Sequence, residues 1–257
     1  MHRLPPVLVV VLLCFGCNAP DQTPSETPPE TPLETSLEST LESSIESPNE
    51  AVTGEELAVV CGFCHGDSLQ GNDRRDGPAL AGLEPWYLEL QLQNYRNGIR
   101  GNVAEDVPGQ IMYFSRGMLR NDATIKSLAE HISTMEPGKP MAANGVGERP
   151  FLWDSPYAGL DPSISGNAEE GKKTYSTICV ACHGAEGKGL EALGAANLLY
   201  LSDVYMVRQL MYFRGGVRGA HPQDTRGQQM AAIAKMLTDD QTIADVVAYI
   251  SELQENQ

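Results

Sequence analysis

Residues 61–66, CGFCHG, and residues 179–184, CVACHG, are two copies of one motif: two cysteines separated by two residues, followed directly by histidine. Within one helical turn, cysteines three positions apart lie on the same side of the backbone. Each thiol can add to one vinyl group of a haem, and the histidine can then donate a ring nitrogen to the iron. The motifs therefore predict two covalently bound haem c groups, held by the residues Cys61, Cys64 and His65 and the residues Cys179, Cys182 and His183.

Pairs of cysteines with this spacing also occur in thioredoxin-like redox sites and in zinc sites. A thioredoxin motif needs no following histidine and lies in a βαβ unit, of which the sequence shows no sign. A zinc site gathers four ligands in space, whereas here each motif is repeated whole with its own flanking segments. The two remaining cysteines, Cys14 and Cys17, lie at the N-terminus, so no pair is left for a structural disulfide.

The motifs belong to an internal repeat. Matching segments follow each motif: YLELQL at 87–92 and YMVRQL at 205–210, RxGxRG at 96–101 and 214–219, and QIM at 110–112 and QQM at 228–230. Apolar periodicity and end signals predict helices at about residues 86–96, 121–135, 167–179, 204–214 and 238–253. Asn121 is expected to cap the last helix of the first copy, and a capping box from Thr238 to Gln241 to begin that of the second. The repeat thus predicts two all-α domains of one kind.

The sixth iron ligand must come from elsewhere in each copy. Outside the motifs and the N-terminus, the histidines are His131 and His221, which occupy different positions in their copies. Two methionines align instead, and a thioether ligand raises the potential of haem iron. We expect Met112 and Met230 to be the ligands, because each follows a Gly/Gln turn in a stretch expected to be non-helical.

A second aligned pair, Met118 and Met236, lies just before the last helix of each copy. Methionine in a helical protein more often fills the core than binds a metal. We interpret this pair as core residues.

Together these residues resemble class I cytochromes c, specifically the two-haem periplasmic carriers built from two fused mono-haem domains, over about residues 50–257. The resemblance implies that the helix before each CxxCH crosses the C-terminal helix of its domain. It also implies methionine ligation shortly before a Leu-Ser/Thr helix start, which Met230 fits and Met112 fits except for Arg120. In that family a carbonyl near a proline orients the histidine ring; Pro78 fits, and Ala196 stands at the equivalent position of the second copy.

Four arginines recur in the RxGxRG segments. They are expected to pair with haem propionates or with the facing domain, or else to cap helix-end carbonyls. The sequence leaves these readings open. The four repeated arginines are Arg96, Arg100, Arg214 and Arg218.

The N-terminus is typical of an exported protein. Residues 1–17 are expected to be a signal peptide, with His2 and Arg3 before an apolar run at 7–15 that is too short to span a bilayer. Gly16 before Cys17 resembles the lipobox of bacterial lipoproteins, in which the cysteine is acylated. The alternative is an ordinary cleaved signal that leaves a soluble periplasmic protein.

Composition separates the remaining segments. Residues 18–48 are rich in Pro, Ser, Thr and Glu and contain no Lys or Arg, which predicts a disordered tether. We place the first cytochrome domain at 49–136, a Pro- and Gly-rich linker at 137–165 and the second domain at 166–257. The formal net charge of the 257 residues is -16, which argues against nucleic acid as a partner.

The predicted function is electron transfer outside the cytoplasm by a membrane-tethered carrier with two haems. Axial ligands on both sides of each iron leave no open position for a substrate, so we do not expect an enzyme. The expected partners are a quinol-oxidising complex or dehydrogenase as donor and a terminal oxidase or reductase as acceptor. The alternatives are a two-haem peroxidase and a fixed cytochrome subunit of a larger respiratory complex.

Overall fold

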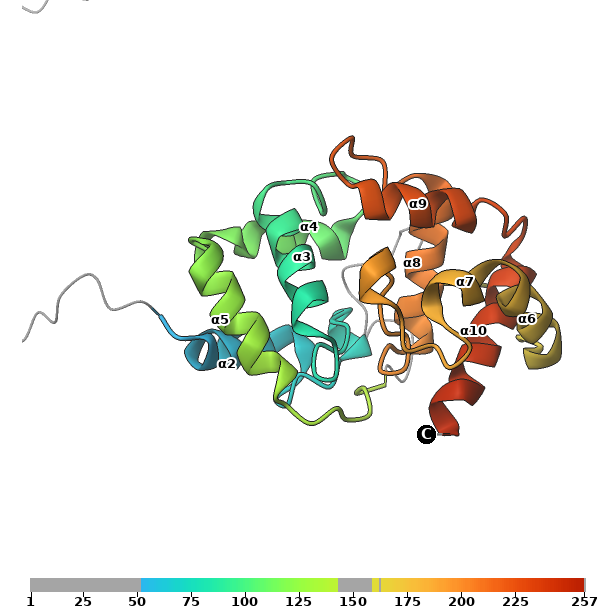
Figure 1. Cartoon of the computed structure of the whole chain (residues 1–257), viewed down its shortest axis with the longest axis horizontal. Coiled ribbons are helices and arrows are strands. Elements are labelled where there is room, and N and C mark those ends of the chain that lie inside the picture. The colour runs from blue at the N-terminus through green and yellow to red at the C-terminus, as the bar shows by residue number, and fades with distance from the viewer. Residues whose placement is uncertain (1–51, 143–158, 162, 257) are drawn as a thin grey trace, which may run out of the picture. The chain divides into compact units, whose positions relative to one another are not determined.

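A computed structural model of the chain describes residues 52–142, 159–161 and 163–256 (Figure 1). The predicted signal peptide and tether and much of the predicted linker lie outside these ranges. In the described ranges the regular elements are helices, and β-type pairing is limited to isolated bridges. The all-α prediction is confirmed. No helix among these residues is long and apolar enough to cross a membrane.

The two repeats have the same order of helices. The first contains α2 (Gly54–His65), the 3-10 turn η1 (Asp73–Arg75), α3 (Pro85–Arg96), α4 (Val107–Phe114), the 3-10 turn η2 (Ser115–Met118) and α5 (Asp122–Ser133). The second contains α6 (Ala168–Thr174), the π-helix η4 (Tyr175–Cys179), α7 (Val180–His183), the 3-10 turn η5 (Glu191–Leu193), α8 (Asp203–Gly215), α9 (Thr225–Ala234) and α10 (Asp240–Glu255). From the CxxCH motif onward, equivalent residues are 118 positions apart.

The last helix of each repeat begins at an equivalent cap. As expected, the side chain of Asn121 accepts a hydrogen bond from the backbone N–H of the third residue along. In the second repeat Asp239 accepts from the Thr242 N–H at 2.8 Å, so the predicted capping box at Thr238 is wrong by one residue. An aspartate caps a helix more effectively than a threonine. Gln241 is thereby free to donate to the Ser165 carbonyl and to Asp245.

A close helix crossing lies at the centre of each repeat, as the resemblance implied. Helix α2 crosses α5 at Gly54, and α6 crosses α10 at Gly171 (Figure 1). A methyl group on Gly54 would overlap the carbonyl oxygen of Ser127, and one on Gly171 would overlap that of Asp245. Glycine is needed at both positions because backbone lies against backbone.

The helix before the second motif differs from its counterpart. Gly54 lies seven residues before Cys61, but Gly171 lies eight residues before Cys179. The additional residue is accommodated by the π-helix Tyr175–Cys179, because a π turn contains one more residue than an α turn. The helix predicted at 167–179 is therefore confirmed, with a π-helix as its second half.

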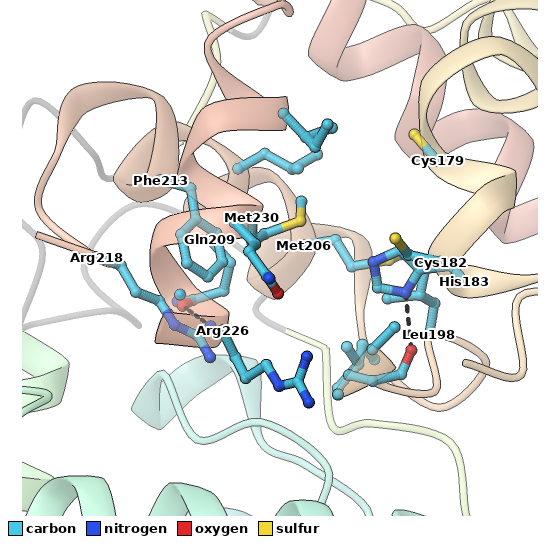
Figure 2. Close-up of a pocket in the computed structure, with 18 of the residues that line it drawn as sticks. Cys179, Cys182, His183, Leu198, Met206, Gln209, Phe213, Arg218, Arg226 and Met230 are labelled. Atoms are coloured by element: carbon cyan, nitrogen blue, oxygen red, sulfur yellow. Dashed lines mark hydrogen bonds between the residues drawn. The ribbon is translucent and has the colours of Figure 1, made fainter. Parts of the chain in front are cut away.

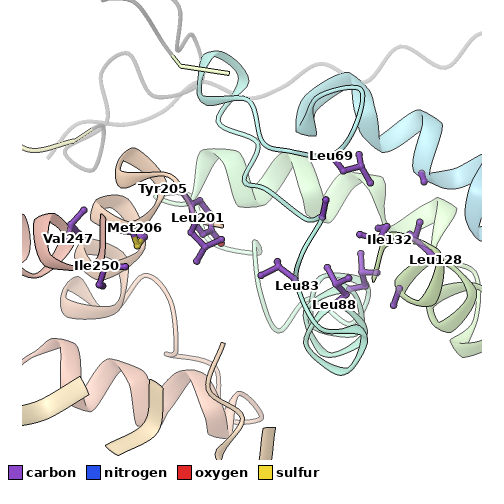
Figure 3. Packing of buried hydrophobic residues seen from close by; sticks show 14 of the residues in the cluster. Leu69, Leu83, Leu88, Leu128, Ile132, Leu201, Tyr205, Met206, Val247 and Ile250 are labelled. Carbon is purple, nitrogen blue, oxygen red and sulfur yellow. The ribbon is translucent and has the colours of Figure 1, made fainter. Parts of the chain in front are cut away.

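Buried apolar side chains from both repeats form a continuous core. In the first repeat, Leu69, Ile125 and Leu128 are almost fully buried, and in the second repeat Met206 and Ile250 join the same cluster (Figure 3). Residues 51–257 accordingly form one compact unit.

Candidate functional site

The second CxxCH motif lies beside an open cavity of about 1230 Å³, a volume that includes the solvent at its mouth (Figure 2). Cys179, Cys182 and His183 contribute from the π-helix and α7, and Met230 contributes from α9. Most other lining residues are apolar; they include Ile178, Leu198, Leu201, Met206, Leu210 and Phe213. The fold thus brings four predicted site residues together around one apolar space.

Each motif histidine is held by a backbone carbonyl. Nδ1 of His65 donates to the Pro78 oxygen at 2.7 Å, and Nδ1 of His183 donates to the Ala196 oxygen at 2.9 Å. A carbonyl only accepts, so the proton is on Nδ1 and the lone pair of Nε2 is free for a metal. The expectation that a carbonyl serves without proline in the second repeat is confirmed.

Burial keeps both imidazoles neutral. Desolvation lowers the pKa of His65 below its ordinary value, and the hydrogen bond to Pro78 partly opposes this change. The same two causes act on His183, with Ala196 in place of Pro78. A neutral imidazole is the form that binds a metal ion.

None of the four motif cysteines forms a disulfide with another described residue. Desolvation, followed by the neighbouring Cys64, raises the pKa of Cys61 to about 11. The pKa of Cys179 is raised to about 11 by desolvation and then by Cys182. Because the thiolate is the reactive form, these thiols are weak nucleophiles at neutral pH in the folded chain without haem.

The methionines differ from the prediction in two respects. Met112 lies in α4 and Met230 in α9, so the stretches expected to be non-helical are helices. Asp106 and Asp224 cap these two helices, so the Gly/Gln residues expected to form a turn lie inside the helices instead. Both methionines are half-buried.

The second methionine pair is not in the core. Met118 is 37% exposed and Met236 is 56% exposed. Each lies in the short turn between two helices, where it contacts solvent rather than the buried cluster. The interpretation of this pair as core residues is therefore wrong.

Two of the repeated arginines join the repeats to each other. Arg100 donates to Gln91 in its own repeat and to Tyr205 and Gln209 in the other, at 2.7, 3.1 and 3.2 Å. Arg218 makes the equivalent contacts with Gln209, Gln91 and Tyr87. The contacts are reciprocal, as in an interface with two-fold symmetry. The reading in which these arginines face the other domain is confirmed.

The other two repeated arginines act within their own repeats. Arg96 pairs with Asp122 at 2.5 Å, and Arg214 pairs with Asp240 and donates to the Leu237 carbonyl. Each arginine therefore joins the end of one helix to the beginning of the last helix of its repeat.

Sequence reasoning missed the interface partners of Arg100 and Arg218. Tyr87 and Gln91 recur in the second repeat as Tyr205 and Gln209, so their repetition was the available signal. It also missed Arg226, which lines the second cavity and donates to the Leu193 carbonyl at 3.0 Å. Arg226 has proline as its counterpart, at position 108, and carries no such signal.

The cavity beside the second motif suits a haem in the chemistry of its lining. Its body is apolar, while Tyr87, Gln209, Arg218 and Arg226 give it a polar, cationic end suited to two carboxylates. Imidazole nitrogen and thioether sulfur are ligands that haem iron accepts.

Comparison with known proteins agrees with this geometry. The family model for cytochrome c matches residues 168–254. Cytochrome c-554(548) of Halomonas halodenitrificans is 34% identical over 87 residues, which cover 34% of this chain and 96% of that protein. A protein named thiosulfate dehydrogenase electron acceptor, from Stutzerimonas stutzeri, is 28% identical over 209 residues, covering 78% of this chain and 83% of the relative.

A solved structure extends the likeness to both repeats. Cytochrome c4 of Acidithiobacillus ferrooxidans has a TM-score of 0.51 and 26% identity, and the match covers 74% of this chain and 97% of that one. The two CxxCH motifs, the shared fold and these relatives imply two covalently bound haem c groups in this chain. The chain belongs to the cytochrome c family, as an electron carrier with two haems built from two tandem class I domains.

Proposed function

We propose that this cytochrome carries electrons between respiratory partners outside the cytoplasm, with one haem in each repeat. The observation that supports this most directly is the convergence of Cys179, Cys182, His183 and Met230 on one apolar cavity. When bound, each haem c iron gains and loses one electron. The first repeat supplies the equivalent residues Cys61, Cys64, His65 and Met112.

Each residue has a defined role in this proposal. The two cysteines of a motif hold the haem through thioether bonds, and the histidine presents Nε2 to the iron because a carbonyl fixes its Nδ1 proton. The methionine would supply a second protein ligand to the iron, and a thioether ligand would raise its potential. Two protein ligands on each iron would leave no position open for a substrate, which favours a carrier over the alternative of a two-haem peroxidase.

The reciprocal contacts of Arg100 and Arg218 support transfer between the repeats. They fix the two domains against each other through buried, charge-assisted hydrogen bonds. A carrier that receives an electron at one domain and releases it at the other needs such a fixed relation. We place the domains at residues 49–136 and 166–257.

Haem content tests the proposal. The denatured wild-type protein should retain two haems by mass, and a Cys61→Ala/Cys64→Ala variant should retain one. Cys17→Ser is the control, because it removes a cysteine outside both motifs, and it should retain both haems. Extraction of both haems from wild-type protein by acid acetone would refute covalent attachment.

The axial methionines need a separate measurement. Met112→Ala and Met230→Ala should each remove about half of the near-infrared band that reports methionine–iron ligation, since each repeat contributes one such bond. Met118→Ala and Met236→Ala are matched controls, because both side chains are exposed. Loss of the band in Met118→Ala and Met236→Ala, but not in the other two variants, would show that Met118 and Met236 are the ligands. Steady peroxide turnover by wild-type protein would favour the peroxidase.

The partners follow from the relatives only as a class. The S. stutzeri relative is named as an electron acceptor for thiosulfate dehydrogenase, so a periplasmic dehydrogenase is our first choice of donor. A terminal oxidase or reductase is the proposed acceptor. Reduction of the purified protein by membranes containing only a quinol-oxidising complex would favour that complex as donor instead.

We also propose that Cys17 anchors the exported protein to a membrane. Cys17 follows Gly16 at the end of an apolar run, and an acidic segment separates it from the haem domains. Acyl chains add about 0.8 kcal/mol per buried methylene, and confinement raises the effective concentration of a membrane partner. Wild-type protein should then label with fatty acid and partition with membranes, and Cys17→Ser should not. A wild-type protein wholly in the soluble periplasmic fraction would refute the anchor.

A further inference from the structure

A buried ion pair between Arg208 and Asp76 joins the two repeats. Nη1 of Arg208, in α8, lies 2.6 Å from Oδ1 of Asp76, and Nη2 donates to the Asp76 carbonyl at 3.2 Å. The side chains are 2% and 0% exposed. Arg208 does not line the cavity beside the second motif, and both of these guanidinium contacts are with Asp76 in the first repeat.

Asp76 belongs to the loop that holds the proximal histidine of the first repeat. Backbone hydrogen bonds in both directions between Asn72 and Gly77 close this loop at 2.7 and 3.1 Å. Gly77 lies so close to the motif that an added methyl group would overlap the carbonyl oxygen of Cys64. The next residue is Pro78, whose carbonyl accepts from His65. A shift at Asp76 is therefore transmitted to the His65 ring through two residues.

The second repeat has no equivalent of this contact. Leu90 stands at the position equivalent to Arg208, and Gly194 stands at that of Asp76. Both loop residues are in the left-handed region, with φ values of 56° for Asp76 and 66° for Gly194. Glycine adopts this conformation without strain and aspartate tolerates it better than most residues, but the turn itself does not require a carboxylate at position 76.

We propose that Arg208 is a positioning residue for the first haem. Its ion pair with Asp76 holds the Pro78 carbonyl in place to accept from His65, and this makes the two haem sites unequal in potential. This inference rests on the proposed ligand role of His65. A firm hydrogen bond to Nδ1 makes the imidazole a stronger donor to the iron and favours the ferric state. In the second repeat, His183 is held by a loop that Arg226 of the same repeat contacts. This loop does not depend on the pair of Arg208 and Asp76.

The test is a redox titration of the full holoprotein followed by NMR, which distinguishes the two haems by their neighbouring residues. The deciding variant is Arg208→Gln/Asp76→Asn, which removes both charges together, so that the local net charge is unchanged. We expect the ratio of reduced to oxidised first haem at a fixed ambient potential to rise at least threefold, about 28 mV for one electron. The second haem should not change.

A second readout is independent of charge. The signal of the His65 Nδ1 proton should move upfield as its bond to Pro78 lengthens, while that of His183 should stay in place. Glu84→Ala is the matched control: it also removes a hydrogen bond between the repeats, from Asn197 at 3.1 Å, but leaves the loop of residues 72–77 untouched. It should leave the first haem unchanged.

Three results would overturn the proposal. The double variant could shift the potentials of both haems equally, or it could fold and leave the potential of the first haem unchanged. Glu84→Ala could also shift the potential of the first haem by the same amount as the double variant. If the double variant loses haem, Asp76→Asn alone replaces it, because asparagine tolerates the left-handed conformation. The same upfield shift confined to His65 is then expected, and its absence overturns the proposal. Absence of iron-dependent shifts on the His65 ring of wild-type protein would instead refute the ligand assignment.

Discussion

The crossing of α6 and α10 allows one substitution to be worked out in advance. In Gly171→Ala, the added methyl group would overlap the carbonyl oxygen of Asp245 and lie 3.0 Å from the backbone nitrogen of Val246. Neither atom can turn aside as a side chain would, so the helices must separate. Overpacking of this kind costs up to about 3 kcal/mol, and alanine returns about 1 kcal/mol of helix preference, which leaves about 2 kcal/mol.

The expected loss can be measured by thermal unfolding of the holoprotein. For a compact unit of residues 51–257, about 2 kcal/mol lowers the unfolding midpoint by roughly 4–8 °C. Gly117→Ala is the matched control, because nothing lies within 4 Å of the added methyl group and its φ is negative. Equal midpoints for the two variants would show that the crossing is looser than the structure has it.

Three further outcomes are expected. Hydrogen bonds from the Thr242 hydroxyl and N–H lower the pKa of the Asp239 carboxyl below its ordinary value of 3.8. The ionised carboxylate therefore stabilises the fold above that pH, and this stabilisation is lost as the pH falls. Asp239→Asn should flatten an acid titration of the unfolding midpoint below about pH 4. Arg208→Met with Asp76 intact should cost about 3 kcal/mol by urea unfolding, because the buried Asp76 carboxylate loses the guanidinium 2.6 Å away. Asn167→Ala should cost about 1 kcal/mol, since Asn167 caps α6.

Much of the architecture follows from patterns that occur twice. Both motifs, the helices and the aligned methionines were predictable because each copy supports the interpretation of the other. The reciprocal contacts of Arg100 and Arg218 were left open, since a repeated arginine is equally suited to a propionate, a neighbouring domain or a helix end. The secondary structure at Met112 and Met230 was wrong, because aspartates at the preceding N-caps begin helices that a glycine-rich stretch conceals.

Features present in one copy only could not be predicted in this way. Nothing in the segment YMVRQL distinguishes Arg208 from an exposed helix arginine, and Asp76 follows two arginines in an ordinary polar loop. Only the packing of the two repeats brings these residues, 132 positions apart, into a buried pair. Long-range asymmetry of this kind has no local signature in a single sequence.

The π-helix before the second motif bears on how the two copies diverged. An insertion in an ordinary helix turns every later residue by about 100° and moves apolar side chains off the core. Here Tyr175–Cys179 takes up the additional residue locally, so Gly171 keeps its crossing with α10 and Cys179 keeps its place at the cavity. Deleting Ser176 should restore a regular helix with both ends in register. The two copies therefore differ in length by one residue within this helix, while Gly171 and Cys179 keep their positions. An alignment of the two copies must place its gap inside the helix rather than in a loop.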